Sequence, residues 1–377
     1  MFIYLDNSAT TKVKESVAET MVNAMTKDFG NPSSLHRLGL NAEHIMKDSR
    51  AAVAKALNAS PEEIFFTSCG TESNNTVVKG VFESKKKQGK RIITTAVEHP
   101  AILQSVQWCA NQGAEVIYLP VDEDCNIKME DLKAALTDDT ILVSVMHVNN
   151  EVGSILPIKE IANYVHANSK AYVHTDAVQS FGKIDVDVKD LGVDFLSISG
   201  HKIHASKGIG ALYIKKGIHI PSFIHGGGQE AGFRSGTESV PLIAGLAEAV
   251  KTLERPKAEV KEYLAKGIVD VFGDTVKINT PKDSAPSVLN VSFIGCRGEV
   301  LLHMLEEKEI YVSTGSACSS NTKKKGSHVL IAMGLKPNEV EGAIRFSFSE
   351  DNTIEEMDRV LEVLTEVVNK HRKLMKR

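Results

Sequence analysis

The sequence predicts an α/β protein, with a large domain built on a mostly parallel β-sheet flanked by helices and a second, smaller α+β domain. Between about residues 64 and 214, short β-branched segments alternate with segments of helical periodicity, which is typical of parallel sheets wrapped by helices. The chain has 377 residues and is 42% hydrophobic, so it can bury a large core but exceeds the usual size of one compact lobe.

Seven candidate strands make up the predicted sheet, and each ends in polar or glycine-rich residues. These strands are Ile64–Thr67, Arg91–Thr95, Glu115–Leu119, Thr140–His147, Ala171–Thr175, Asp194–Ser199 and Gly210–Ile214. In sheets of this kind, ligands bind beyond the carboxyl ends of the strands. The residues that follow the strands are therefore candidates for one shared pocket.

The second domain follows Glu254–Lys257, a charged segment with a proline that we interpret as a break. Its expected elements are strands near Val288–Phe293 and Ala343–Phe348, a helix near Gly298–Leu305, and a last helix from about Thr353 whose apolar residues keep a helical period. We assign residues 16–254 to the large domain, and residues 1–15 together with 255–377 to the small domain.

The N-terminus and the composition exclude several classes of protein. Met1–Asp6 lacks the basic and apolar regions of a signal peptide, and no apolar run is long enough to span a bilayer, so we expect a cytoplasmic protein. With 44 Lys and Arg against 48 Asp and Glu, the net charge of −4 offers no general attraction for nucleic acid or anionic lipid. The five cysteines include no C-x-x-C pair, so we expect neither a disulfide framework nor a metal site.

Lys202 ends the segment Ser199–Lys202, at the end of a predicted strand. A lysine at that place can form a Schiff base with an aldehyde cofactor if burial or neighbouring cations lower its pKa. On this segment alone, an ordinary surface lysine is the simpler interpretation. The residues at the neighbouring strand ends therefore decide between the two.

Asp176 and Gln179 follow the preceding strand and would reach the same region. Pyridoxal 5′-phosphate (PLP) needs an acid beside its pyridine nitrogen, because a protonated ring is the better electron sink. Gln179 could donate a hydrogen bond to the phenolate oxygen of the ring. Asp176 fits equally well as the N-cap of a following helix, and the two roles are compatible.

The segment Phe66–Asn75 has the pattern of a strand, a tight turn and a helix start. Free backbone N–H groups at Gly70 and Thr71, with the threonine hydroxyl, would bind a phosphate at the helix N-terminus. A plain capped helix explains the same residues. The spacing matches neither a Walker P-loop nor a dinucleotide-binding motif.

Two further positions carry weaker signals. His99 precedes a proline suited to a first helical position, where an imidazole could stack on a cofactor ring and move protons, although a loop histidine is usually structural. Arg345 lies in an apolar strand, where its charge requires a partner if it is buried. That partner is either a substrate carboxylate, with Asn149 adding a hydrogen bond, or an acidic side chain; otherwise Arg345 lies on the solvent face.

Cys318 lies in Ser313–Thr322, a run of small polar residues without helical or strand periodicity. A thiol in such a segment is expected to be exposed and reactive, and the lysines that follow could help to keep a thiolate. Cys109, in a helical pattern, and Cys296, after a strand, are interpreted as core thiols.

Together these segments resemble the NifS/IscS family of cysteine desulfurases, within the PLP-dependent enzymes of fold type I. The similar segments are Tyr4–Thr11, Gly30–Ser34, Gly70–Asn75, Glu98–His99, Asn149–Gly153, Asp176–Gln179, Ser199–Lys202, Gly226–Glu230, Arg234–Thr237 and Gly315–Cys318. The resemblance runs nearly end to end. It implies the fold-type-I architecture, with PLP bound by the large domain.

The resemblance also implies a role for each candidate residue. Lys202 would form the Schiff base, His99 would stack on the ring and move a proton, and Cys318 would carry sulfur as a persulfide. The cofactor-binding residues would be Gly70, Thr71, His99, Asp176, Gln179, Ser199, His201 and Lys202, with Thr237 from the other subunit of a homodimer. Asn149 and Arg345 would bind the substrate carboxylate.

The implied reaction converts L-cysteine to L-alanine and passes the sulfur to acceptor proteins for iron–sulfur clusters, thiolated tRNA or thiamin. A selenocysteine lyase, or another PLP enzyme of fold type I, is the alternative. Two departures from the family pattern concern the acceptor. Ala231 replaces a common arginine, and Lys323–Gly326 replaces the usual acidic, proline-containing approach to the next segment.

Overall fold

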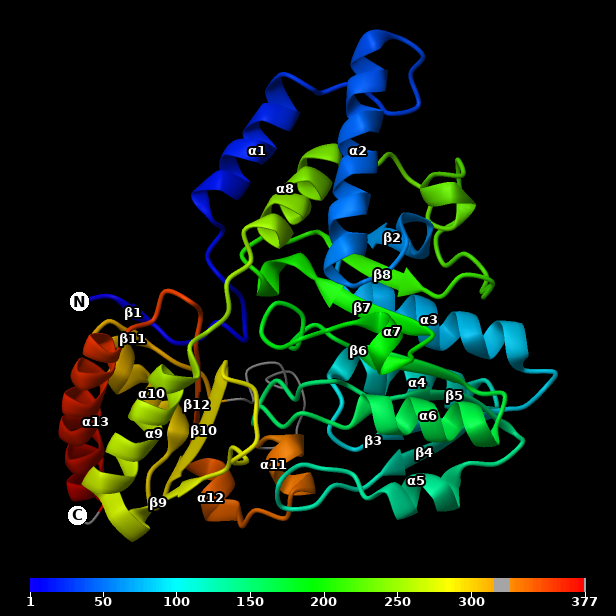
Figure 1. The fold of residues 1–377 in the computed structure, drawn as a ribbon. Helices are drawn as coiled ribbons and strands as arrows, with labels where there is room; N and C mark the ends of the chain where they lie inside the picture. Colours follow the sequence, from blue (N-terminus) through cyan, green and yellow to red (C-terminus); the bar gives the residue numbers. More distant parts are fainter. Residues whose placement is uncertain (315–325, 376–377) are drawn as a thin grey trace.

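The computed structural model describes residues 1–314 and 326–375, which form two lobes with separate hydrophobic cores (Figure 1). The larger lobe contains a seven-stranded sheet, and the smaller lobe contains a three-stranded and a two-stranded sheet. Among the described residues, no helix is both long and apolar enough to cross a membrane.

The large sheet has the strand order β2-β8-β7-β6-β5-β3-β4. Its strands are β2 (Ile64–Thr67), β3 (Arg91–Thr95), β4 (Glu115–Leu119), β5 (Thr140–Ser144), β6 (Tyr172–Asp176), β7 (Phe195–Ser199) and β8 (Gly210–Ile214). β8 runs antiparallel to both of its neighbours, and the other neighbouring pairs are parallel. The predicted mostly parallel sheet is confirmed, although β5 ends three residues earlier than predicted, at Ser144 instead of His147.

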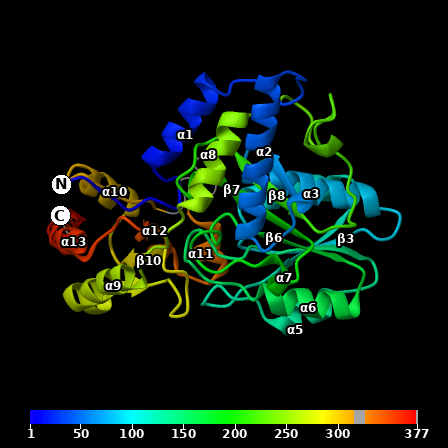
Figure 2. The same ribbon diagram turned by 45° about the horizontal axis from the view of Figure 1, so that its top comes forward.

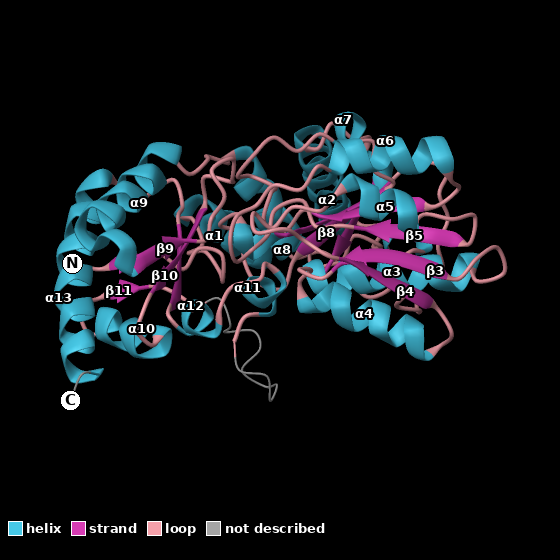
Figure 3. Cartoon of the chain, turned by 90° about the horizontal axis from the view of Figure 1, so that it is seen from below, coloured by secondary structure: helices cyan, strands magenta, loops and turns pink. Residues whose placement is uncertain are grey.

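Helices cover both faces of this sheet because successive strand residues point to opposite sides. Ile92 and Leu142 pack in one cluster with α3 and α4, whereas the next residues along the strands, Ile93 and Val143, pack in another with α2, α6 and α8. Figure 3 shows α4 on one side of the strands and α6 on the other. The helices of this lobe are α1 (Glu15–Thr26), α2 (Arg37–Ala56), α3 (Gly70–Lys85), α4 (Pro100–Asn111), α5 (Met129–Ala135), α6 (Ile158–Asn168), α7 (Val188–Leu191) and α8 (Val240–Lys251). α1 and α2 both pack against α8, as Figure 2 shows.

The small lobe packs helices against an antiparallel sheet of order β12-β10-β9. Its elements are β1 (Ile3–Tyr4), α9 (Ala258–Phe272), β9 (Val276–Ile278), β10 (Val288–Phe293), α10 (Gly298–Glu306), β11 (Ile310–Tyr311), α11 (His328–Ala332), α12 (Pro337–Glu341), β12 (Ala343–Ser347) and α13 (Ile354–Met375). Met357, Val360 and Leu364 are fully buried on one face of α13, as its period predicts.

The N-terminal segment joins the small lobe before the chain enters the large one. β1 pairs in parallel with β11, and Ile3 and Leu5 belong to the small-lobe core. Val17, in α1, belongs to the core of the large lobe. Ile3 and Leu5 thus lie in the small-lobe core, whereas Thr11 and Lys14 bond to the backbone of the large lobe. The assignment of residues 1–15 to the small domain stays a prediction.

Candidate active site

A cavity of about 310 Å³ lies at the carboxyl ends of the central strands of the large sheet. Its lining includes nine residues that were expected from the sequence: Gly70, Thr71, His99, Asp176, Gln179, Ser199, His201, Lys202 and Arg345. Except for Arg345, each of them ends a strand of the large sheet or lies within four residues after one, where the parallel topology places loops at one edge of the sheet. One pocket therefore collects side chains that are far apart in the sequence.

The start of α3 forms one wall of the cavity. The N-cap residue Cys69 makes no side-chain capping bond to the N–H groups of the first turn, which have no partners within the helix itself. Gly70 is required by close packing, because a Cβ there would lie 2.7 Å from Cγ2 of Val178. The backbone of Gly70 and Thr71 can thus approach an anion at the helix N-terminus.

Asp176, the last residue of β6, places a carboxylate in the cavity at 5% exposure. Its Oδ2 accepts a hydrogen bond from Asn74 Nδ2 at 2.7 Å, and its Oδ1 accepts one from the Val178 N–H at 3.0 Å. Residues 178–180 form a turn instead of a helix, so the interpretation of Asp176 as a helix N-cap is wrong. The carboxylate is held by two donors and stays available to a cationic ring nitrogen.

Lys202 lies in a 3₁₀ turn, Gly200–Lys202, directly after β7. Its Nζ donates to the backbone carbonyls of Ser8 at 2.5 Å and Ala9 at 2.7 Å. Gln179 Nε2 also donates to the Ser8 carbonyl, at 3.0 Å. The N-terminal segment therefore orients two candidate residues from a distance of more than 170 positions in the sequence.

Several polar atoms of the cavity are buried and have no hydrogen-bond partner among the described residues. They are Ser199 Oγ, Gln179 Oε1, Asn74 Oδ1 and Ser8 Oγ. Buried polar atoms are normally paired, so several unpaired atoms in one cavity indicate a polar ligand. An acid, an amine and an anion-binding helix end in the same cavity are the groups that PLP requires, and the site fits this cofactor.

Both histidines of the cavity are neutral at neutral pH. Burial lowers the pKa of His99, and the nearby Lys202 lowers it further against an opposing effect of Asp176. His99 Nδ1 accepts from the Ala101 N–H at 3.1 Å, so the neutral ring carries its proton on Nε2. Burial, with Lys202 and Lys207, lowers the pKa of His201 to about 4.

Arg345 reaches the cavity from β12 of the small lobe and is 4% exposed. Its Nη2 pairs with Asp6 Oδ1 at 2.9 Å, and its Nη1 donates to the Asn150 carbonyl at 2.9 Å. Its Nε is buried and has no partner in the described part of the chain. The guanidinium is thus held at two points and keeps an unused donor, which excludes the solvent-face interpretation.

Two expected site residues, Asn149 and Thr237, lie elsewhere. Asn149 does not line the cavity, because its side chain donates to the Val97 carbonyl at 3.1 Å and accepts from the Glu151 and Val152 N–H groups. Its neighbour Asn150 lines the cavity instead.

Thr237 lines a separate cavity of about 60 Å³, together with Phe66 and Arg234. Cys318 lies outside the described residues.

Sequence reasoning missed Asn74, Ser8 and Asp6. Asn74 lies one helical turn after Gly70, and this spacing places both on the same face of α3. Ser8 and Asp6 could not be found from local patterns, because their contacts are made across the fold. A larger cavity of about 630 Å³ in the small lobe borders Thr314 and Gly326, on either side of the segment outside the described residues.

Comparisons with known proteins identify the family of the chain. The chain matches the class-V aminotransferase family over residues 3–360. A relative named cysteine desulfurase IscS, from Clostridium botulinum, is 45% identical over 99% of this chain and 96% of its own. A solved structure of a NifS-like protein is 40% identical, with a TM-score of 0.91 over 98% of this chain and 100% of the other. Another, SspA in complex with cysteine, is 34% identical, with a TM-score of 0.83 over 93% of this chain and 100% of the other.

The chain therefore belongs to the NifS/IscS family of cysteine desulfurases, within the PLP-dependent class-V aminotransferases.

Proposed function

We propose that this protein is a cysteine desulfurase that uses the cavity at the end of the large sheet to convert L-cysteine to L-alanine. The observation that carries the proposal is the meeting of Lys202, Asp176 and the start of α3 in one cavity. A relative of known structure is described in complex with cysteine, which supports the same substrate.

The residues of the cavity would hold PLP at four points. Lys202 would bind its aldehyde carbon, Asp176 its ring nitrogen and Gln179 its phenolate oxygen. The phosphate would be held by Gly70, Thr71, Ser199 and His201, and by Thr237 of a second subunit. When bound, PLP supplies the electron sink that makes the bonds at the substrate Cα labile.

The side chains around the substrate have separable tasks. Arg345 would bind the cysteine carboxylate through the guanidinium N–H groups that Asp6 and Asn150 leave unused, among them Nε. Asn150, rather than Asn149, lines the cavity beside it and would add a hydrogen bond. His99 in its neutral form and the Lys202 amine are placed to take and return the Cα proton.

Cys318 would be the acceptor of the sulfur. Its thiolate would attack the substrate sulfur, forming an S–S bond while the C–S bond breaks and its electron pair remains with the carbon fragment. That fragment takes up protons and leaves as alanine, and Cys318 holds the sulfur as a persulfide. An acceptor protein then takes the sulfur by attack of its own thiolate.

Three further features complete the proposal. The protein would act as a homodimer, because Thr237 lies outside the cavity of its own chain. It would work in the cytoplasm, where a reducing environment keeps Cys318 free. Sedimentation and cell fractionation test these two points. The acceptor would belong to iron–sulfur cluster assembly, tRNA thiolation or thiamin synthesis, and transfer of labelled persulfide to cellular proteins identifies it.

The test of the function is production of alanine and sulfide from cysteine by the yellow, PLP-loaded protein. We expect Cys318→Ser to abolish sulfur release, and Cys296→Ser, at a buried thiol, to leave it unchanged. Wild-type sulfur release by Cys318→Ser would overturn the persulfide role. A faster reaction with selenocysteine than with cysteine would favour the alternative, a selenocysteine lyase.

A further inference from the structure

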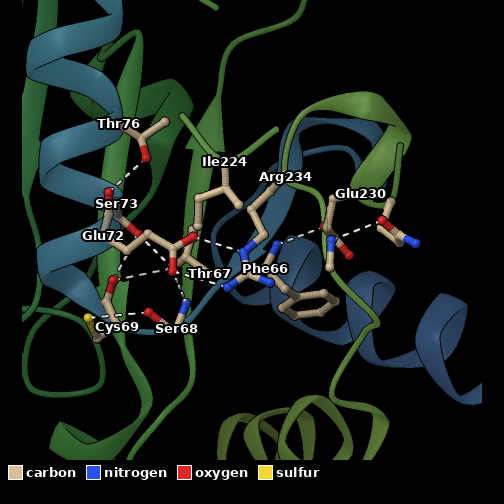
Figure 4. Close-up of polar contacts among 12 residues, drawn as sticks. Phe66, Thr67, Ser68, Cys69, Glu72, Ser73, Thr76, Ile224, Glu230 and Arg234 are labelled. Carbon is tan, nitrogen blue, oxygen red and sulfur yellow. Dashed lines mark hydrogen bonds and ion pairs between the residues drawn. The ribbon is translucent and has the colours of Figure 1, made fainter. Parts of the chain in front are cut away.

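The free edge of β2 is paired with side chains instead of another strand (Figure 4). Glu230 Oε2 accepts a hydrogen bond from the Phe66 N–H at 2.8 Å. Ser68 comes two residues after Phe66, and its N–H donates a hydrogen bond to Glu72 Oε2, also at 2.8 Å. Both carboxylates are nearly buried, with side-chain exposures of 3% for Glu230 and 8% for Glu72.

Each of these carboxylates also pairs with an arginine. Arg50 of α2 binds Glu230 through both Nη atoms at 2.8 Å. Arg234 binds Glu72 through Nε at 2.9 Å and Nη2 at 3.3 Å. Glu230 and Arg234 belong to residues 224–237, which we call the docked loop. Two ion pairs therefore hold the docked loop against β2 and its surroundings. The loop supplies the acid in one pair, Glu230, and the base in the other, Arg234.

The two pairs differ in their distance from the candidate phosphate site. Glu72 lies in the first turn of α3, directly after Gly70 and Thr71. Glu72 follows Gly70 and Thr71 in the helix, and its side chain bonds to Ser68, which precedes them. Contacts of Glu72 thus lie on both sides of Gly70 and Thr71. Glu230 bonds to Phe66, which lies inside β2 and before the turn begins. Only the Glu72–Arg234 pair can act directly on the anion site.

We propose that Arg234 and Glu72 are positioning residues for phosphate binding, a role that rests on the proposed function. Glu72 holds the segment before α3 in place through its bond to the Ser68 N–H. Arg234 neutralises the negative charge that the Glu72 carboxylate brings to the first turn of α3. A carboxylate in the first turn is attracted to the same partial positive charge of the helix N-terminus that would bind the phosphate. Without Arg234, the carboxylate charge would oppose the phosphate.

The test compares the affinity of the full-length apoprotein for PLP and for pyridoxal, which lacks the phosphate. We expect Arg234→Gln to weaken PLP binding about tenfold, the effect of one uncompensated charge at a partly buried helix end, and to change pyridoxal binding little. Glu72→Gln/Arg234→Gln should recover most of the loss, because the glutamine oxygen can still accept from Ser68 without a charge. Glu72→Gln alone should bind PLP at least as tightly as the wild type.

Arg50→Gln is the matched control, because it breaks the other tie of the same docked loop. Equal PLP losses in Arg50→Gln and Arg234→Gln would overturn the inference, since loop anchoring alone would then explain both. An equal loss for pyridoxal, or a double variant as weak as Arg234→Gln, would also overturn it. If Arg234→Gln does not fold, the Glu72→Gln variant decides, and weaker PLP binding by that variant contradicts the inference. Failure of the proposed function is distinct, since the wild type itself would then bind no PLP.

Discussion

The large and the small lobe contribute unequally to the cavity. The large lobe supplies Lys202, Asp176, His99 and the start of α3, whereas Arg345 is the contribution of residues 255–314 and 326–375. The first group suits a cofactor, and the second suits a substrate carboxylate. Cofactor binding and substrate recognition can therefore be changed separately.

The N-terminal segment connects the two tasks. The Ser8 carbonyl accepts hydrogen bonds from Lys202 and Gln179 of the large lobe, and Asp6 pairs with Arg345 of the small lobe. The three-residue segment Asp6–Ser8 thus contacts the cofactor side and the substrate side of the site. Changes at Ser8 are therefore expected to affect cofactor binding, and changes at Asp6 to affect substrate binding.

The largest effect is expected from the large lobe, at Lys202. Lys202→Ala removes the amine that would bind the cofactor and move a proton, so turnover should fall by on the order of a thousandfold or more. The lysine-bound absorbance of PLP should disappear, as measured by spectroscopy together with alanine formation. Lys207→Ala, at an exposed position nearby, is the control and should retain both. Turnover above a tenth of wild type in Lys202→Ala would remove this residue from the mechanism.

In the small lobe, Arg345→Lys should separate the two tasks. A lysine keeps the charge but loses the planar fork, so the KM for cysteine should rise roughly 10- to 100-fold, the value of hydrogen bonds to a charged group. The absorbance of bound PLP should not change, because the cofactor-facing residues belong to the other lobe. Arg297→Lys, at a half-exposed arginine of the small lobe, should leave KM unaltered. Loss of the PLP absorbance in Arg345→Lys would contradict the assignment of cofactor binding to the large lobe and substrate binding to the small lobe.

The pH dependence of stability should be determined mainly in the large lobe. Burial lowers the pKa of His174 to about 3 and of His147 to about 4. Below about pH 6.5 these histidines bind protons in the unfolded chain but not in the folded one, so their contribution to the free energy of unfolding falls as the pH drops. Each histidine contributes about 1.4 kcal/mol per pH unit within its window.

Urea unfolding between pH 6.5 and 4.5 measures this effect. His174→Asn should reduce the slope of the unfolding free energy against pH by about one histidine's share. Ser144 and Ser197 bind the two ring nitrogens of His174, so the variant is also less stable at pH 7. An unchanged slope would show that the acid sensitivity arises elsewhere.

The smallest effect is expected where the lobes are connected, at Asp6. Asp6→Asn keeps the shape of the side chain but removes the charge that orients Arg345, so KM should rise about fivefold, in the range of a single partly exposed ion pair. Cofactor absorbance and kcat should stay near wild type. A lower KM would show instead that Asp6 competes with the substrate carboxylate for Arg345.

Much of the fold follows from local sequence patterns. The alternation of strands and helices predicts the large sheet, because each βαβ unit is specified by its own residues. The break near residue 254 and the period of α13 likewise predict the second lobe. The boundary errors, such as the end of β5, are of a few residues.

The site was predictable where function lies at strand ends, and less so where it depends on long-range contacts. Asp176 ends β6 and Lys202 follows β7, so both lie at one edge of the sheet. The choice between Asn149 and Asn150 depends on a turn that buries the first side chain, which no local pattern reveals. The contact of Lys202 with Ser8 joins residues 194 positions apart and requires both lobes in place.

The side-chain pairing along β2 has a further consequence, for solubility. An exposed edge strand with free N–H groups can recruit a strand from another molecule and so begin aggregation. In this chain, the Phe66 and Ser68 N–H groups are already occupied by carboxylates, and the charged docked loop covers them. The residues that organise the candidate anion site thus also close this edge of the sheet to intermolecular β-pairing.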